Sequence, residues 1–480
     1  MGPHVKDVSV AILAACLTAA AAQEIPGMGR EGKYLPVRES LLRHPLPEWF
    51  DEAKLGIFVH WGLYSVPAFA PPTGELGKVD FSQWFRINPY AEWYLNTMKI
   101  KDSPTWEHHV KTYGADFDYL NFADTFNREV RKWQPEQWAR VFKEAGARYV
   151  VLTTKHHDGF TLWPSRVPNP NRKPDRQGSQ RDLVGELAAA VRGQGMRMGL
   201  YYSGGLDWSF VDTPVRGFPD LFKTVPQSEE YARYADAHWR ELIERFSPDI
   251  LWNDISYPKK GDLLNIFADY YNKQPDGLIN NRFGVEHADF TTPEYQTYAR
   301  ITEKKWEACR GLGFSFGYNK AEGPEHVLPA DKLVDLLVDI VSKNGNLLLN
   351  VGPKPDGTIS DLQLDRLRAL GGWLAVNGEA IYATKPWVRA AGRASGVDVR
   401  FTRKGDAVYA ILLDRPAPPN VVLESVWAGE RMTVQVLGAP GAVVWKQKGK
   451  DIELTLPARL PGDYAYVVKM SPAPWQVVRE

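Results

Sequence analysis

Short apolar runs alternate with amphipathic segments between about residues 50 and 385. The runs are mostly continuous, as in strands that are covered on both faces. They lie at 55–62, 148–160, 196–205, 249–254, 277–284, 290–295, 314–319 and 346–353. Segments of helical period separate many of them, for example 135–147, 182–195, 229–246 and 330–345. Strands interleaved with helices in this way predict an α/β fold, a (β/α)8-like barrel over residues 30–385.

The pattern changes after about residue 390. Apolar and polar residues alternate in 397–414, 432–456 and 463–470, with turn sequences at Lys404-Gly405-Asp406 and Lys448-Gly449-Lys450-Asp451. Alternation of this kind is typical of half-buried antiparallel strands. We therefore expect a C-terminal antiparallel β-sandwich over residues 390–480. We expect it to pack against the barrel, and a carbohydrate-binding role for it is an open alternative.

The N-terminal segment has the layout of a secretory signal peptide. Lys6 precedes an apolar stretch from Val8 to Ala22 that ends in small residues. This predicts a leader at 1–22 and export, either periplasmic or secreted. The stretch is too short for a comfortable membrane span. Cys16 follows Leu-Ala-Ala as in a lipoprotein signal, so lipid attachment at Cys16 is an alternative.

The composition is that of a soluble globular protein, with 44% hydrophobic and 24% charged residues. A formal net charge of zero favours neither nucleic acid nor an anionic membrane as a partner. The chain has 17 Trp and 21 Tyr. Such aromatics can provide platforms for sugar faces, or simply a large core. Removal of the leader would leave Cys309 as the one thiol and no internal disulfide. The oligomeric state stays open, a homo-oligomer included.

Polar side chains gather at the C-terminal ends of the predicted strands. In barrels of this type the active site is assembled at that end. Adjacent histidines on a strand point to opposite faces, and the chain has no His-Glu-x-x-His motif and no cysteine cluster. We therefore predict an active site without a metal. The polar residues are His60, His156, His157, Tyr201 or Tyr202, Asp254 and Arg282.

Several segments of residues 35–390 resemble the α-L-fucosidases of glycoside hydrolase family 29. They are DEAKLGIFVHWGLYSVPAFAP, KHHDGFTLWPS, GLYYSGGLDW, PDILWNDISYP, GFSFGYNKAEGPEH and GNLLLNVGPKPDGTI. The resemblance implies the same barrel followed by a β-sandwich. It also implies a retaining exo-α-L-fucosidase, which hydrolyses terminal fucose by double displacement and needs two carboxyl groups and no cofactor.

By this resemblance Asp254 is the nucleophile. Glu294 is the best candidate for the acid/base, protonated for the first step, and Glu92 is the main rival. The resemblance chooses Tyr201 over Tyr202. Trp84 is expected either at the rim of the site or in the core. It implies sugar contacts around the hydroxyls from His60, Glu92, Trp93, His156, His157, Tyr201 and Arg282, and an apolar wall from Trp252 and Phe316.

Two further expectations complete the prediction. Asp158 and Asp207 are expected to orient His157 and the loop that follows. The expected partner is a fucosylated oligosaccharide or glycoconjugate, whose linkage the sequence does not reveal. Two alternatives stay open: a hydrolase of a related sugar such as an α-L-galactoside, and a fucose-binding barrel without catalysis.

Overall fold

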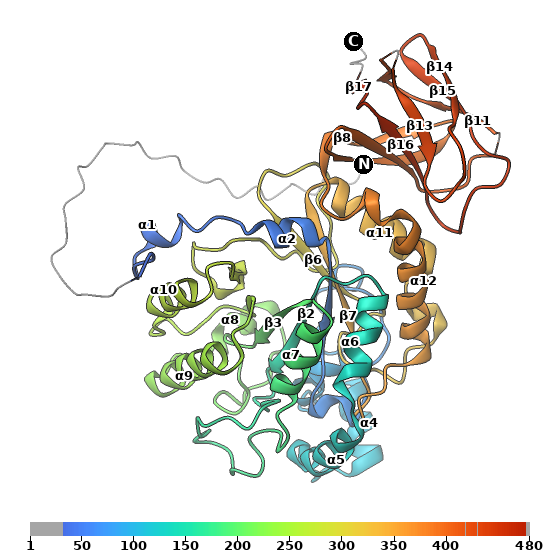
Figure 1. Ribbon diagram of the computed structural model, residues 1–480. Helices are drawn as coiled ribbons and strands as arrows, with labels where there is room; N and C mark the ends of the chain where they lie inside the picture. Colours follow the sequence, from blue (N-terminus) through green and yellow to red (C-terminus); the bar gives the residue numbers. More distant parts are fainter. Residues whose placement is uncertain (1–31, 418, 430, 477–480) are drawn as a thin grey trace, which may run out of the picture.

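The computed structural model describes residues 32–417, 419–429 and 431–476. The predicted leader, with Cys16 and Ala22, lies outside the described residues. Within the described part, seven parallel strands form a curled sheet in the order β5-β4-β3-β2-β1-β7-β6 (Figure 1). These strands are β1 (Leu55–Val59), β2 (Tyr149–Lys155), β3 (Arg197–Tyr202), β4 (Ile250–Asn253), β5 (Leu278–Ile279), β6 (Trp306–Gly311) and β7 (Gly345–Val351).

An irregular segment joins the two edges of this sheet. Asn280 forms a parallel bridge with Phe290, Thr291 with Trp306, and Glu294 with Cys309. Residues 290–294 thus stand between β5 and β6, at the place of a further barrel strand. The (β/α)8-like architecture predicted from the apolar runs is confirmed. Because β1, β2 and β7 are buried along their whole length, their sequences are continuous apolar runs rather than alternating ones.

The prediction of a strand at 314–319 is wrong. The strand in that region is β6, and residues 314–319 form the loop that follows it. The sequence of β6, WEACRG, contains the charged residues Glu307 and Arg310, so it does not form the continuous apolar run that predicts a buried strand. Glu307 is buried because Tyr149 and Trp252 hydrogen-bond to its carboxylate inside the barrel. The predicted runs 277–284 and 290–295 are reduced to the short β5 and to isolated bridges.

Helices surround the sheet. The four predicted segments are confirmed as α6 (Pro135–Glu144), α7 (Leu183–Gly193), α9 (Glu229–Phe246) and α11 (Ala330–Ser342). Asp182 and Ser228 cap α7 and α9 by accepting backbone hydrogen bonds at their N-termini. The remaining α-helices are α1 (Arg38–Leu41), α2 (Glu48–Ala53), α3 (Tyr94–Thr97), α4 (Pro104–Tyr113), α5 (Phe122–Glu129), α8 (Phe218–Lys223), α10 (Leu263–Lys273) and α12 (Asp361–Asn377).

The C-terminal strands form the predicted antiparallel β-sandwich. In the described residues an eight-stranded sheet has the order β13-β16-β10-β9-β8-β11-β15-β14, and a small sheet pairs β12 with β17. The predicted turns at Gly405 and Gly449 connect β9 to β10 and β14 to β15, and both glycines have positive φ. A hydrogen bond from the amide of Val443 to the carbonyl of Val434 brings the two edges together. These strands are β8 (Lys385–Ala394), β9 (Val397–Lys404), β10 (Ala407–Leu412), β11 (Asn420–Leu423), β12 (Val426–Trp427), β13 (Thr433–Val436), β14 (Val444–Lys448), β15 (Asp451–Thr455), β16 (Tyr466–Ser471) and β17 (Trp475–Gln476).

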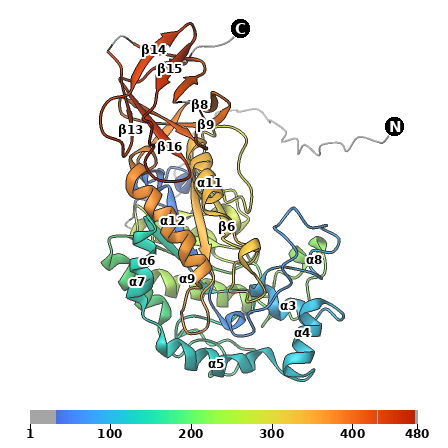
Figure 2. The same cartoon turned by 90° about the vertical axis from the view of Figure 1, so that its right-hand side faces the viewer.

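The sandwich packs on α11 and α12, as expected. Arg400 of β9 forms a 2.6 Å ion pair with Asp339 of α11, and Trp373 of α12 donates a hydrogen bond to the carbonyl of Ala465. The long insertion after β1, which carries α3, α4 and α5, lies at the opposite end of the barrel (Figures 1 and 2). None of the helices in the described part of the chain has the length and apolar character that a bilayer span requires.

Candidate active site

One cavity of about 220 Å³ collects the residues predicted for the site. It lies at the C-terminal ends of the parallel strands, where the ends of β1, β2, β3 and β4 meet the long insertion. Trp84 also lines it. The predicted residues on its wall are His60, Glu92, Trp93, His156, His157, Tyr201, Trp252, Asp254, Arg282, Glu294 and Phe316.

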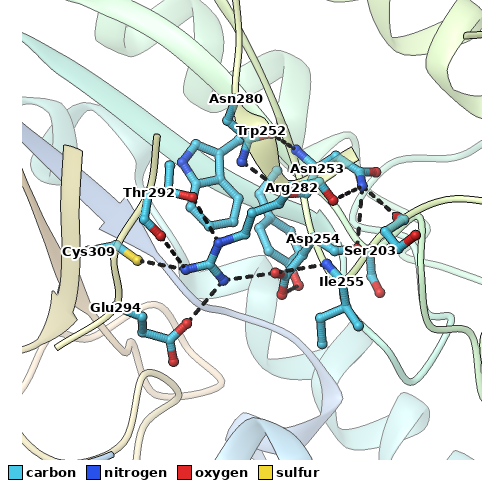
Figure 3. A network of polar contacts seen from close by, with 12 residues as sticks. Ser203, Trp252, Asn253, Asp254, Ile255, Asn280, Arg282, Thr292, Glu294 and Cys309 are labelled. Atoms are coloured by element: carbon cyan, nitrogen blue, oxygen red, sulfur yellow. Dashed lines mark hydrogen bonds and ion pairs between the residues drawn. The ribbon is translucent and has the colours of Figure 1, made fainter. Parts of the chain in front are cut away.

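Arg282 joins the two predicted catalytic carboxylates. Its Nη1 lies 2.9 Å from Oδ1 of Asp254 and 3.0 Å from Oε2 of Glu294 (Figure 3). These two oxygens are therefore separated by at most the sum of the two contacts, about 5.9 Å. The guanidinium is itself held in place, since Nε and Nη2 donate to the side chain and carbonyl of Thr292, and its face lies over Trp252.

Asp254 stands at the end of β4 in a tight turn. Its Oδ2 accepts a 3.0 Å hydrogen bond from the Tyr201 hydroxyl, and Oδ1 accepts one from the amide of Ile255. Ile255 and Ser256 have φ values of 52° and 72°, so the chain leaves β4 through two left-handed residues. Asn253 braces this turn by donating to the carbonyl of Ser256. The carboxylate is thereby fixed before any ligand binds.

Glu294 reaches the cavity from the irregular segment between β5 and β6. Its Oε1 accepts a 2.9 Å hydrogen bond from the hydroxyl of Tyr90, a residue of the insertion after β1. Glu92 lies two residues further along that insertion. Its Oε2 accepts hydrogen bonds from the amide of Gly317 and the hydroxyl of Ser315. Burial raises the pKa of Glu92 to about 8. Its carboxyl group is therefore protonated at neutral pH and can donate a hydrogen bond.

Hydrogen bonds set the tautomers of two histidines. Asn350 donates its amide to the carbonyl of Phe316, so its Oδ1 accepts from Nδ1 of His60 at 2.6 Å. Ser203 donates to the carbonyl of Leu206, so its Oγ accepts from Nδ1 of His157, also at 2.6 Å. Both rings therefore carry the proton on Nδ1 and keep Nε2 as an acceptor. Nε2 of His157 lies 4.0 Å from Oδ2 of Asp254.

Burial of neutral His60 and His157 makes the folded protein less stable in acid. Burial lowers their pKa values to about 3 and about 4, from an ordinary value of 6.5. Below pH 6.5 the unfolded chain binds protons that the folded chain does not, so stability is complete above pH 6.5 and falls as the pH drops toward 4. Between pH 7 and pH 5, we expect His157→Gln to lose about 2 kcal/mol less unfolding free energy than the parent protein. Urea unfolding at the two pH values measures this, and identical losses would contradict it.

Comparison with known proteins identifies the family. A family model described as Alpha-L-fucosidase matches residues 21–379, and one described as Alpha-L-fucosidase C-terminal domain matches residues 394–471. The chain belongs to the α-L-fucosidase family. It is 34% identical to the tissue alpha-L-fucosidase of Homo sapiens over 98% of both chains, and 36% identical to that of Bos taurus over 92% of this chain and 91% of the relative.

Solved structures agree with this assignment. Thermotoga maritima alpha-fucosidase in complex with a mechanism based inhibitor superposes with a TM-score of 0.85 at 49% identity, covering 91% of this chain and 100% of that one. Its complex with fucose gives a TM-score of 0.84 at 48% identity, with the same shares covered. The chain is therefore a glycoside hydrolase that releases fucose from a glycan substrate.

The expectation that Asp158 and Asp207 orient His157 is wrong, whereas the support expected for the following loops is present. Each aspartate accepts a hydrogen bond from the backbone amide two residues further on. Ser203, not an aspartate, makes the hydrogen bond that orients the ring of His157. Asp207 instead forms a fully buried 2.7 Å ion pair with Lys155. Asp158 accepts hydrogen bonds from the Tyr119 hydroxyl and the amide of Phe160. Asp207 compensates the buried charge of Lys155, and Asp158 is the acceptor for the buried hydroxyl of Tyr119. Both groups would be costly to bury without these acceptors, so the two aspartates stabilise the surrounding structure.

Several wall residues of this fucosidase site were missed from the sequence. Phe58 packs against Trp252 with ring centroids 4.9 Å apart and extends the apolar wall toward Phe316. Its position on β1, two residues before His60, was a usable signal, because alternate strand residues share a face.

Tyr202, the alternative to Tyr201, points away from the cavity and contacts His238. No group of metal-ligating side chains occurs in the described residues.

Proposed function

We propose that the protein is an exported, retaining exo-α-L-fucosidase in which Asp254 is the nucleophile and Glu294 is the acid/base. The spacing of the two carboxylates carries this proposal. Retaining glycosidases hold their carboxyl groups about 5–5.5 Å apart, whereas inverting enzymes need about 6.5–9.5 Å to admit a water molecule. The bound of about 5.9 Å set by the shared contact with Arg282 supports the retaining class.

The reaction follows from the positions of these groups. Asp254 attacks C1 of the fucose while the C1–O bond breaks, and the departing oxygen takes the proton of Glu294. A water molecule then attacks C1, gives a proton to Glu294 and releases Asp254. Arg282 holds both carboxylates in place throughout. It balances the negative charge, which resides on Asp254 before the attack and on Glu294 in the glycosyl intermediate.

The cavity also suits the sugar itself. The Nε2 atoms of His60 and His157 can accept hydrogen bonds from fucose hydroxyls, and the protonated Glu92 can donate a hydrogen bond to one. The apolar wall of Phe58, Trp252 and Phe316 offers a surface for the C6 methyl group. The Thermotoga maritima relatives include a complex with fucose and a fucosynthase made by an aspartate-to-glycine change, which supports an aspartate nucleophile.

The stereochemistry of the first product tests the retaining mechanism. Hydrolysis of an aryl α-L-fucoside should release α-L-fucose first, because two inversions at C1 restore the starting configuration. Proton NMR of the anomeric signals during the first minutes measures this, before mutarotation mixes the anomers. Initial release of β-L-fucose would contradict the double displacement. Absence of any hydrolysis would contradict the catalytic assignment.

The apolar wall also separates fucose from the rival substrate. An α-L-galactoside carries a hydroxyl where fucose has its methyl hydrogen, and burying an unpaired hydroxyl costs about 1–3 kcal/mol. We therefore expect kcat/KM for the aryl α-L-fucoside to exceed that of the matching galactoside by roughly 10- to 100-fold. Equal values for the two aryl glycosides would contradict the assignment of the wall.

The leader supports export of the protein. We propose cleavage after Ala22, with the barrel at residues 30–385 and the sandwich at 390–480. N-terminal sequencing of the exported protein tests the cleavage site, and a lipid-modified Cys16 would contradict it.

A further inference from the structure

We infer that the C-terminal sandwich carries a second binding site, for an acidic saccharide that bears a sulfate or carboxylate group. The site is a pocket of about 880 Å³ in the described part of the sandwich, here called the sandwich pocket. This volume is within the range of about 300–1,000 Å³ that is common for ligand sites. The lining residues that carry the inference are Trp387, Arg403, Asp406, Arg431, Met432 and Trp475.

The sandwich pocket is remote from the catalytic cavity. The sandwich packs on one end of the barrel, whereas the insertion that lines the catalytic cavity lies at the opposite end (Figures 1 and 2). The residues that line the sandwich pocket all belong to segments 386–388, 403–406, 429–432 and 472–476, and none of them lines the catalytic cavity. A saccharide in the sandwich pocket is therefore neither the fucose that is cleaved nor its direct neighbour.

The floor of the sandwich pocket is apolar and held in place. Trp387 and Met432 are buried members of the sandwich core. The ring of Trp387 packs on Phe401 with centroids 5.0 Å apart, and the carbonyl of Met432 accepts a hydrogen bond from the indole of Trp445. The pocket thus reaches down to the core, and its floor is formed before any ligand binds.

The wall of the sandwich pocket leaves a large apolar surface in water. Trp475 is 62% exposed and Val388 is 67% exposed. The indole of Trp475 is supported by the backbone of Gly429, where even a Cβ would lie 3.5 Å from the ring. Exposed apolar surface of this kind marks a site that a ligand covers. The broad face of an indole suits the carbon–hydrogen face of a sugar ring.

The charged groups of the sandwich pocket select an anion. Two guanidinium groups, of Arg403 and Arg431, stand against one carboxylate, that of Asp406, so the pocket has an excess of one positive charge. Asp406 already accepts a hydrogen bond from the amide of Ala473. Neither arginine side chain makes a hydrogen bond or ion pair with a described residue. Their planar donors are free to bind an oxyanion through paired hydrogen bonds.

Shape and context favour a saccharide over a protein partner. Stable protein interfaces use about 20–30 residues from each partner, whereas 13 residues line this concave pocket. An acidic saccharide combines the two features that the pocket recognises, an apolar ring face and an oxyanion. The chain belongs to a family that acts on glycans, so saccharides are the ligands that meet this surface.

The two strands of the small sheet offer a matched pair of tryptophans for the test. Trp427 lies directly opposite Trp475 in the pairing of β12 with β17 and is 48% exposed, but it does not line the sandwich pocket. We would compare Trp475→Ala with Trp427→Ala. Both replacements remove a half-exposed indole from the same sheet, and only one removes it from the pocket.

A second pair of variants tests the charge. The double variant Arg403→Gln/Arg431→Gln removes both guanidinium groups of the pocket. The control is Arg415→Gln/Arg459→Gln, since these two arginines are exposed on the same domain outside the pocket. Both double variants change the net charge of the chain by the same amount. Thermal unfolding shows that each variant is folded.

Affinity electrophoresis of the full chain measures binding, as the mobility in gels with a polysaccharide relative to a gel without one. The polysaccharides are dextran, dextran sulfate and polygalacturonate. None of them carries fucose, so the result does not depend on the catalytic assignment. We expect retardation by an acidic polysaccharide and none by dextran. Retardation by dextran sulfate alone would assign the sulfate group to the ligand, and retardation by polygalacturonate alone would assign the carboxylate; either result supports the inference.

Arg403→Gln/Arg431→Gln should weaken this binding about tenfold or more, because charged hydrogen bonds are lost. Trp475→Ala should weaken it about fivefold or more, because the indole face is lost. Both controls should stay within about twofold of the parent. Equal losses in the controls would overturn the inference, since they would indicate binding spread over the surface.

Three further results would overturn the inference. One is the absence of retardation by both acidic polysaccharides, and another is equal retardation by dextran. The third concerns a second copy of the chain as the occupant of the sandwich pocket. In that case sedimentation equilibrium would show an oligomer that Trp475→Ala dissociates and Trp427→Ala does not.

Discussion

Replacing Asp254 with glycine should remove nearly all turnover, and added azide should restore part of it. Loss of a nucleophile costs roughly 10³-fold or more in kcat, because the covalent intermediate no longer forms. The glycine leaves a gap on the face of the sugar where the carboxylate stood, and azide can attack from that gap. A single displacement then yields β-L-fucosyl azide. Rates with an activated aryl α-L-fucoside, with and without azide, and NMR of the product measure both effects.

Asp254→Asn is the matched control for this experiment. The asparagine side chain fills the space of the carboxylate, so azide should restore far less activity than in Asp254→Gly. Both variants should stay folded, because Arg282 keeps its contacts with Glu294 and Thr292. A folded Asp254→Gly protein that azide does not rescue would contradict the role of nucleophile.

Replacing Glu294 with alanine should have an effect that depends on the leaving group. A general acid contributes about 10²–10⁴-fold when the departing oxygen is strongly basic, as in a sugar or alkyl fucoside. A dinitrophenolate needs no proton, so its departure should be slowed far less. The ratio of kcat/KM for the two kinds of substrate, in the parent and in Glu294→Ala, measures this. Azide should now intercept the intermediate and yield α-L-fucosyl azide, the anomer opposite to that from Asp254→Gly.

Glu92→Gln is the control for the acid assignment, because Glu92 is the rival acid and its pKa is raised to about 8. If Glu92 only binds a sugar hydroxyl, its replacement should slow good and poor leaving groups by the same factor. It should also remove any loss of activity near pH 8, where Glu92 gives up its proton and places a further negative charge in the cavity. Losses that grow with the basicity of the leaving group would transfer the acid role to Glu92.

The amino-acid sequence by itself determined the parts of this protein that depend on local pattern. The buried runs of β1, β2 and β7 are continuous because both faces of these strands are covered, and they predicted the barrel. The hairpin turns at Gly405 and Gly449 could be predicted because these turns need a residue with positive φ, which glycine adopts without steric cost. The polar residues at strand ends could be grouped because parallel strands place their C-terminal ends at one edge.

Only the tertiary structure decided the contacts between distant residues. The sequence pattern did not predict strand β6, because it contains the charged residue Glu307. This carboxylate can be buried only because it accepts hydrogen bonds from Tyr149 and Trp252, which are remote in the chain. Ser203 rather than an aspartate orients His157, and Arg282 joins Asp254 to Glu294. A linear pattern reports whether a side chain is buried, but a hydrogen bond or an ion pair depends on distance and direction. These are set only when the barrel closes and brings separate strands and loops around one cavity.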